Sequence, residues 1–303
     1  MAEATHPESS AVGASALATA RPQRTWLRET LVRLVANRGA TAGLITILLM
    51  IVGVVFAPVF APYDPIEVDV TTTLAAPSLD HPLGTDTIGR DVLSRIIYGG
   101  RISIRVGVVA ILIACGVGLP LGMIAGYYGK WVDRTLSRLI DVLLAFPGIL
   151  LALAVVAVLG SSVTNATVAV GISLIPGFYR LARSSYLTAK ENVYVEAARV
   201  IGVRDHRIII RHILPNVIAS IMVLATVAMG WAIIIGASLS FLGLGVQAPT
   251  PEWGADLASG REWIRTAWWL STFPGIAIMI LIVAVNLLGD GLRDALDPRL
   301  RNR

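Results

Sequence analysis

The stretch Asn192–Asn216, NVYVEAARVIGVRDHRIIIRHILPN, decides how the rest of the chain is organised. It lies between two strongly apolar segments, yet it carries several charges and two histidines, so it does not fit inside lipid. Asn192 is placed as a helix N-cap, and the run from Val193 to Ile201 contains no helix breaker. Gly202 then supplies the left-handed turn that ends a helix. This pattern predicts a short helix and a sharp turn at the surface of a membrane.

A second helix is expected after that turn. Asp205 is placed to cap it, and Pro215 limits it because proline lacks the N–H group that a helix interior needs. In the first helix, Ala197 and Ala198 stand beside Glu196, and such small side chains let the surface of another protein approach closely. The alternative is an ordinary amphipathic connector between two membrane helices.

The composition is typical of a membrane protein that crosses the bilayer several times. Of its 303 residues, 55% are hydrophobic and only 15% are charged, whereas a soluble domain carries about a quarter charged residues. The mean hydropathy is +0.72, and several apolar runs are long enough to cross a bilayer as helices. The expected fold class is an all-α membrane protein with six transmembrane helices. The predicted spans are residues 41–61, 103–126, 138–160, 164–182, 217–245 and 270–289.

The distribution of lysine and arginine predicts the orientation of these spans. With the N-terminus inside, 19 of the 25 basic residues fall in or next to inner segments and 6 fall in outer ones. The positive-inside rule then places both termini, and the Asn192–Asn216 stretch, in the cytoplasm. The basic balance of the chain is therefore an effect of membrane topology and argues against nucleic acid as a partner.

The segments outside the spans differ in composition. Residues 1–24 are rich in Ala, Ser, Thr and Pro and are expected to form a disordered cytoplasmic tail. Residues 25–40 carry apolar side chains at helical spacing with arginines between them, which predicts an interfacial amphipathic helix. The transmembrane domain then occupies residues 41–303, with an outer loop at 62–102 and a cytoplasmic loop at 183–216.

The outer loop contains a further candidate helix. Thr85 or Asp86 is placed to cap it, and the apolar side chains within residues 92–97 give it one apolar face. We expect this helix to lie flat on the outer leaflet or against the bundle. His81 has no second His or Cys near it in sequence, so it is interpreted as a turn residue and not as a metal ligand.

Asp141 is the one acidic side chain expected inside a span. Intramembrane acids indicate an ion or proton path by default. Arg138 lies about one helical turn away, however, so a local pair with Arg138 or a position at a helix interface is favoured for Asp141. Pro147 and Gly148 are expected to kink the third span.

The central stretch resembles a known motif. Glu196-Ala197-Ala198, then Gly202, then Ile213-Leu214-Pro215 is similar to the EAA motif of the permease subunits of ABC importers. In that family the loop contains the coupling helix, which docks into a groove on the cytoplasmic ATPase. The resemblance implies an ATPase-coupling role for Tyr194, Glu196, Ala197, Ala198, Gly202, Asp205 and Pro215.

Other stretches resemble one branch of that family, which carries dipeptides, oligopeptides and nickel. The resemblance runs from about Leu44 to the end of the chain, and the span number and the C-terminal sequence resemble the "C" subunit of a permease pair. One departure is Gly236, where many relatives carry an acid. The matching stretches are HPLGTD at 81–86, GRDVLSR at 89–95, LSFLGLG at 239–245 and NLLGDGLRDALDPR at 286–299.

The resemblance implies a type I importer core in the inner membrane of a prokaryotic cell. The implied partners, besides lipid, are a homologous permease that completes a heterodimer, two ATPase subunits that bind ATP and Mg²⁺, and an extracytoplasmic binding protein. The chain has no phosphate-binding loop, so neither a cofactor nor an enzymatic activity of its own is expected. Docking of the binding protein, or an outer gate, is predicted for Arg90, Asp91, Arg95, Glu252 and Trp253.

Two other classes of function stay open at this point. A secondary transporter or channel needs ion-binding groups at mid-membrane, for which Asp141 is the single candidate, and inverted repeats would favour it. A membrane enzyme needs a catalytic arrangement of side chains, whereas the four histidines of this chain lie in tail or loop positions.

Overall fold

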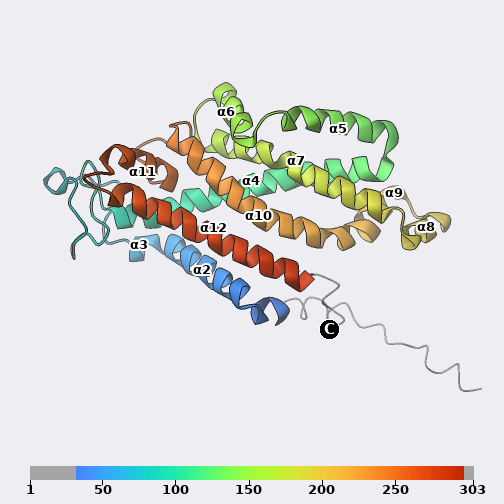
Figure 1. The fold of residues 1–303 in the computed structure, drawn as a ribbon, viewed down its shortest axis with the longest axis horizontal. Coiled ribbons are helices and arrows are strands. Elements are labelled where there is room, and N and C mark those ends of the chain that lie inside the picture. The colour runs from blue at the N-terminus through green and yellow to red at the C-terminus, as the bar shows by residue number, and fades with distance from the viewer. Residues whose placement is uncertain (1–31, 297–303) are drawn as a thin grey trace, which may run out of the picture.

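The computed structural model describes residues 32–296, which form helices joined by loops and no strand (Figure 1). The long helices run lengthwise beside one another; they are α2 (Arg38–Val55), α4 (Val92–Tyr128), α7 (Val163–Ala189), α10 (Leu214–Phe241) and α12 (Trp269–Leu296). The shorter ones are α3 (Ala57–Phe60), α5 (Lys130–Leu144), α6 (Gly148–Leu159), α8 (Val193–Val200), α9 (Asp205–Arg207) and α11 (Trp253–Gly260). Single turns of 3₁₀ helix occupy Val70–Thr72 and Arg261–Trp263, and a π-helix occupies Ile208–Ile213. The predicted all-α class is confirmed for this part of the chain.

Different segments occupy the two ends of the bundle (Figure 1). We term one end of the bundle the α8 end; it also holds α9. We term the opposite end the α11 end; it also holds the loop between α3 and α4. α2 begins and α12 finishes at the α8 end, where the side-chain amide of Asn37 donates to the carboxylate of Asp294 at 3.3 Å. This is the arrangement that the predicted topology requires. The predicted tail 1–24, and residues 25–31 of the predicted helix 25–40, lie outside the described residues.

Within residues 32–296, four helices are long and apolar enough to cross a membrane. They are α2, α4, the continuous helix Asp205–Phe241, and α12. The pair α5–α6 makes a fifth candidate if it is counted as one bent span. α7 covers the predicted span 164–182 but does not reach the same apolarity. The structure therefore supports a multi-pass membrane protein and leaves the number six as a prediction.

The predicted surface helix of the outer loop is in fact the beginning of α4. Asp91 caps it, accepting from the backbone N–H of Ser94 at 2.8 Å, so the prediction of a cap at Thr85 or Asp86 is wrong. α4 continues through the predicted boundary, and Gly100 lies inside it at a close contact with α2. A Cβ atom on Gly100 would lie 2.6 Å from a side-chain methyl of Val54.

The third predicted span, 138–160, is two helices joined at a bend of 89°. The break falls just before Pro147, because proline disfavours helical backbone in the residue that precedes it. α5 also begins earlier than predicted, at Lys130. Its apolar residues lie on one face, of which Ile140 is the buried member, whereas α6 is apolar all round.

Small residues bring α4 and α7 into close contact over the halves nearer the α8 end. Gly118, Gly122 and Gly126 recur every four residues, so they share one face of α4. A Cβ atom on Gly122 would lie 2.5 Å from the backbone oxygen of Tyr179, and the other two glycines meet the α7 backbone at 2.6–2.7 Å. The prediction that small residues in this span allow close helix packing is confirmed at these positions, whereas Gly116 faces open space.

Candidate functional site

The Asn192–Asn216 stretch folds as a short helix, a left-handed turn and a longer helix, as predicted. α8 ends at Val200 with Ile201 as its C-cap, and Gly202 follows with a φ of +80°, a conformation that glycine adopts without steric cost. The N–H of Gly202 donates to the oxygen of Arg199 at 2.9 Å, and the N–H of Val203 donates to the oxygen of Ala198 at 3.0 Å. These two bonds form a Schellman motif, which fixes the direction in which the chain leaves α8.

Three details of this stretch differ from the sequence expectation. The side chain of Asn192 does not cap α8 but donates to the oxygen of Ala189 at 3.1 Å. Asp205 is the first residue of α9 and not its cap, because its carboxylate accepts from the hydroxyl of Tyr127 at 2.7 Å. Pro215 does not end the second helix, since α9, the π-helix and α10 continue into one another from Asp205 to Phe241.

One face of α8 is apolar, exposed and unpaired in the described chain. Its members recur at i, i+3, i+4, i+7 and i+8, the spacing of a single helical stripe. Val193, Val200 and Ile201 are each about 80% exposed, which is unusual for large apolar side chains. We term this stripe the α8 face; it consists of Val193, Glu196, Ala197, Val200 and Ile201.

The two alanines of the motif have different surroundings. Ala197 is exposed on the α8 face, in line with its predicted role in close approach. Ala198 is only 5% exposed and packs inward together with Val195. The prediction that both alanines serve the approach of another protein therefore does not hold for Ala198, whose small size serves the packing of this chain.

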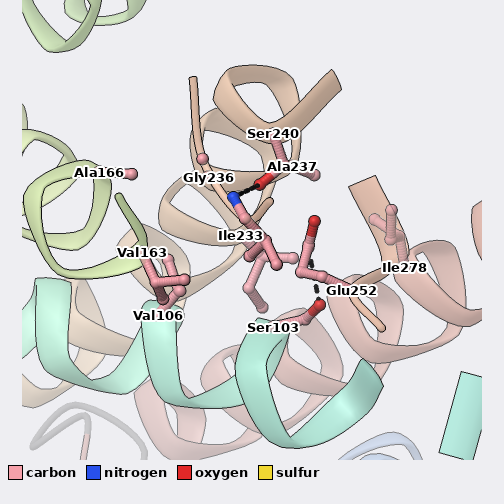
Figure 2. A pocket seen from close by; sticks show the side chains of 12 residues that line it. Ser103, Val106, Val163, Ala166, Ile233, Gly236, Ala237, Ser240, Glu252 and Ile278 are labelled. Carbon is pink, nitrogen blue, oxygen red and sulfur yellow. Dashed lines mark hydrogen bonds between the residues drawn. The ribbon is translucent and has the colours of Figure 1, made fainter. Parts of the chain in front are cut away.

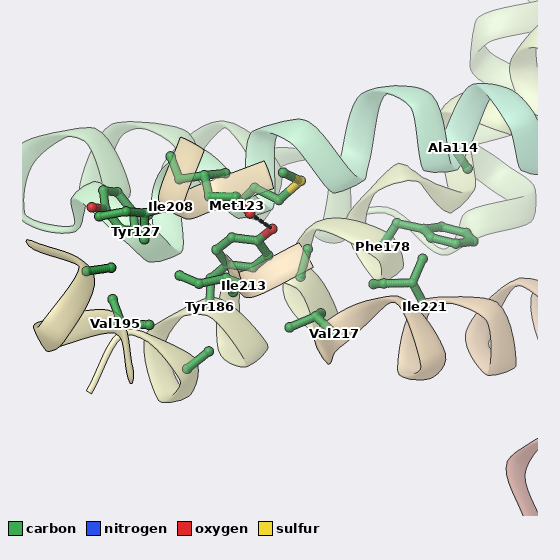
Figure 3. Packing of buried hydrophobic residues seen from close by; sticks show 14 of the residues in the cluster. Ala114, Met123, Tyr127, Phe178, Tyr186, Val195, Ile208, Ile213, Val217 and Ile221 are labelled. Carbon is green, nitrogen blue, oxygen red and sulfur yellow. Dashed lines mark hydrogen bonds between the residues drawn. The ribbon is translucent and has the colours of Figure 1, made fainter. Parts of the chain in front are cut away.

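The inner side of α8 rests on a cluster of buried side chains from four helices (Figure 3). Tyr127 comes from α4, Tyr186 from α7, and Ile208 and Ile213 from the π-helix. All four are at most 6% exposed. α8 is therefore attached to the transmembrane helices by a packed core and not by a flexible connector.

A polar groove of about 740 Å³ opens beside α8. It lies between the end of α7 and the start of α10, and its lining carries hydroxyl and amide groups but no charged side chain. Tyr194 belongs to this groove, where its hydroxyl accepts from the side-chain amide of Asn216 at 3.3 Å. Tyr194 therefore lies beside the α8 face and not within it.

At the opposite end, buried polar side chains attach α11 to the first turns of α4. The guanidinium of Arg95 donates to the carboxylate of Asp256, and it also donates to the backbone oxygens of Pro65 at 3.0 Å and Pro249 at 3.2 Å. Burial raises the pKa of Asp256 to about 6 although Arg95 beside it favours the charged form. Arg95 thus joins three segments of the chain in one place.

Glu252 and Trp253 complete this attachment. One carboxylate oxygen of Glu252 accepts from the hydroxyl of Ser103 at 2.9 Å (Figure 2), and the other caps α11 through the N–H of Ala255 at 2.9 Å. The indole N–H of Trp253 donates to the oxygen of Ile96 at 2.8 Å. We term Arg95, Ser103, Glu252, Trp253 and Asp256 the α11 cluster.

The predicted outer-face residues are buried. Arg95, Asp91, Glu252 and Trp253 are at most 5% exposed, and Arg90 is half-buried against Asp86 with 2.6 Å between their charged groups. Side chains placed in this way do not reach a docking protein in this conformation, so a docking role for them is not supported. An outer gate remains a prediction.

Two further residues nearer the α11 end have clear surroundings. His81 contacts Asp91 at 3.0 Å through Nδ1, so it supports the residue that caps α4. Gly236 lies beside a small cavity at the α11 end, into which Glu252 also projects (Figure 2). A Cβ atom on Gly236 would lie 2.9 Å from Val106, so a larger side chain there would need rearrangement.

Asp141 does not pair with Arg138 and instead faces α7. Its carboxylate lies 3.7 Å from the guanidinium of Arg180 on α7, and both side chains are about two-thirds exposed. An exposed ion pair of this kind contributes little to the stability of the protein. A second ion pair, between Asp133 and Arg183, links α5 to α7 more closely and was not anticipated from the sequence. Within residues 32–296, no group of three or more His, Cys, Asp or Glu side chains is placed to hold a metal ion.

Comparison with known proteins gives consistent matches. The family described as binding-protein-dependent transport system inner membrane component matches residues 118–302, and the N-terminal TM domain of oligopeptide transport permease C matches residues 25–77. The chain is 46% identical over 275 residues to the dipeptide transport system permease protein DppC of Alkalihalophilus pseudofirmus. The matched region covers 91% of this chain and 90% of that protein. It is also 46% identical over 280 residues to the glutathione transport system permease protein GsiD of Pectobacterium atrosepticum, with 92% and 93% covered. A solved structure of the inward-facing MetNI methionine ABC transporter matches with a TM-score of 0.55 at 17% identity, covering 67% of this chain and 97% of that one, which shows a likeness of fold.

Proposed function

The chain belongs to the permease subunits of binding-protein-dependent ABC importers, and on that premise we propose that it forms half of a translocation path for di- or oligopeptides. The second half is a homologous permease, and an extracytoplasmic binding protein delivers the solute. The similarity to permeases named for dipeptides and for glutathione supports a short peptide as solute. Nickel, or another small solute, is the alternative with the same architecture.

The observation that carries the proposal is the α8 face. An exposed apolar stripe with one acid, on a helix that the remainder of the chain holds rigidly, suits insertion into a groove of another protein. We propose that this partner is the cytoplasmic ATPase, of which two copies bind ATP and Mg²⁺. Glu196 then orients the docked helix, Ala197 allows close approach, and Gly202 sets the angle between the docked helix and α9.

The proposed mechanism follows from how this loop is attached. ATP binding closes the two ATPase subunits, and the grooves that hold the α8 helices move. The displacement passes through the Schellman turn into α10 and through the buried cluster into α7. The cavity between the two permeases then changes from inward-facing to outward-facing, and hydrolysis returns it. ATP drives this cycle only because the ATPase contacts differ between the two states.

The proposed location is the inner membrane of a prokaryotic cell, with the α8 end in the cytoplasm. The supporting observations are the basic residues near the α8 end and the position of both described chain ends there. The uncharged lining of the groove beside α8 supports passage of solutes with varied side chains, because hydroxyl and amide groups bind peptide backbone. Selectivity is then expected on the binding protein.

The proposal is tested by purifying this chain from detergent-solubilised membranes and assaying ATP hydrolysis on what accompanies it. We expect a homologous permease and ATPase subunits, and stimulation of hydrolysis by a peptide-loaded binding protein. A chain that purifies alone, as a stable assembly without ATPase, would refute the proposal and favour an ion-driven carrier.

A substitution separates coupling from assembly. We expect Gly202→Asp to insert and assemble but to hydrolyse ATP with little uptake, because a side chain disfavours the φ of +80° and changes the direction of α8. Gly160→Asp is the matched control: Gly160 has a φ of +86° and equally open surroundings, but it lies between α6 and α7, away from the loop. Normal uptake by Gly202→Asp would contradict the role of the loop.

A further inference from the structure

Two tyrosines that the EAA motif does not include hold the coupling loop to the bundle. Tyr127 lies in the last turn of α4, and Tyr186 lies in the last turns of α7. Both are nearly or fully buried, and both rings belong to the cluster beneath α8 (Figure 3). Each hydroxyl donates into the segment that links α8 to α10, although the tyrosines come from different helices.

Tyr127 contacts both sides of the Gly202 turn. Its hydroxyl donates to the carboxylate of Asp205, after the turn, at 2.7 Å. The guanidinium of Arg199, before the turn, lies 5.1 Å from the centre of the Tyr127 ring, within the range of a cation–π contact. A hydrogen bond to a carboxylate is stronger than one between neutral groups. The relative position of α8 and α9 therefore depends on a side chain of α4.

Tyr186 contacts the π-helix. Its hydroxyl donates to the backbone oxygen of Ile209 at 3.0 Å, and the same oxygen accepts from the N–H of Leu214 five residues on. Tyr186 is thus a second donor to an oxygen of the π-helix, and it fixes the π-helix to α7.

We propose that Tyr127 and Tyr186 are positioning residues that pass the ATP-driven displacement of the loop to α4 as well as to α7. The inference rests on the proposed function, since it requires the loop to be moved by an ATPase. α4 is one unbroken helix of 37 residues, and its other end carries Arg95 and Ser103 of the α11 cluster. A displacement received at Tyr127 therefore reaches α11 at the opposite end through one continuous helix.

The test uses the assembled transporter in proteoliposomes, with peptide uptake and ATP hydrolysis measured on the same sample. Tyr127→Phe keeps the ring but removes the hydroxyl, and we expect uptake per ATP hydrolysed to fall about fivefold or more, which is the lower range of coupling effects. Asp205→Ala removes the acceptor from the other side and is expected to give the same loss without additivity in the double variant. Tyr128→Phe is the matched control, because Tyr128 is half-exposed on the same turn and its hydroxyl has no hydrogen bond among the described contacts.

A distance measurement adds a readout that general destabilisation does not mimic. Spin labels at Leu112 on α4 and Met279 on α12, both exposed, report whether the two helices separate when ATP binds. We expect an ATP-dependent change in the parent protein and in Tyr128→Phe, and its loss in Tyr127→Phe and Asp205→Ala. Asp205 is exposed, so its substitution keeps the test valid if Tyr127→Phe fails to assemble.

The possible outcomes distinguish a failure of the role inferred for the tyrosines from a failure of the proposed transport function. A parent transporter that takes up peptide with ATP, and Tyr127→Phe and Asp205→Ala variants that do so with unchanged yield and unchanged distances, would overturn the inference and leave the proposed function intact. A correctly assembled parent that shows no ATP-driven uptake of any peptide or nickel probe would refute the proposed function and the inference together.

Discussion

The close contact between α4 and α7 leads to a quantitative prediction for Gly122→Ala. The added Cβ atom would lie 2.5 Å from the backbone oxygen of Tyr179, 2.7 Å from the Cβ of Ala182 and 3.0 Å from the backbone nitrogen of Arg183. Non-bonded carbon atoms pack at about 3.5–4.0 Å. The neighbours are mostly backbone, so they cannot rotate away, and α7 has to move outward by roughly 1 Å to accept one methyl group.

The expected cost follows from this displacement. Overpacking of a well-packed interface costs about 1–3 kcal/mol. Gly116→Ala, on another face of the same helix, meets no atom within 4 Å and is expected to gain about 0.5–1 kcal/mol from helix propensity. Both variants add the same methyl group to the same helix, so their gain in helix propensity cancels and the difference between them, about 1–3 kcal/mol, reports the contact alone.

The free energy of unfolding is measurable by titrating SDS into detergent micelles and following tryptophan fluorescence, for which the chain has seven tryptophans. We expect Gly122→Ala to unfold at a lower SDS fraction than the parent protein and Gly116→Ala at the same or a higher one. Equal unfolding curves for the two variants would refute the close approach of α4 and α7. They would also refute the role of Gly118, Gly122 and Gly126 in allowing that approach.

Two further predictions concern ion pairs. Arg95→Gln leaves the buried carboxylate of Asp256 without its cation and is expected to destabilise the protein by about 3–5 kcal/mol at pH 8 in the same assay. Because burial raises the pKa of Asp256, the folded state binds the proton more readily than the unfolded state does. The stability lost in Arg95→Gln should therefore be smaller at pH 5 than at pH 8. A stability loss that grows on acidification would contradict this reasoning. Asp141→Asn, by contrast, is expected to change stability by less than about 0.5 kcal/mol, since its pair with Arg180 is exposed, and to leave uptake normal. Loss of uptake in Asp141→Asn would instead favour an ion path.

Much of the fold could be predicted because local chemistry determines it. Gly202 has the left-handed conformation expected of it, and the chain breaks at Pro147, where a kink was expected. The sequence misleads where a residue type that often ends a helix can also lie inside one. Gly99 and Gly100 indicate a helix end when read locally, but they lie within α4, where their lack of a side chain admits Trp253. Pro215 likewise indicates a helix boundary, yet a preceding π-helix accommodates it.

The contacts that build the site were less accessible from the sequence, because they join residues far apart in the chain. Tyr127 and Asp205 are 78 positions apart, and Arg95 and Asp256 are 161 apart. No local pattern marks a tyrosine at a helix end as the donor to a distant loop. Arg95 and Glu252 are charged residues of predicted outer segments, and charge alone suggests exposure, whereas each has enough partners to be buried.

The opposite surroundings of Ala197 and Ala198 have a consequence for the evolution of this protein. Ala198 is enclosed by this chain, so the size tolerated there should vary across species together with residues of the same chain, such as Val195 and Tyr127. Ala197 faces outward on the α8 face, so under the proposed docking its variation should follow the sequence of the ATPase. Two adjacent residues of one motif would then vary under two separate constraints: packing within this chain for Ala198 and contact with another protein for Ala197.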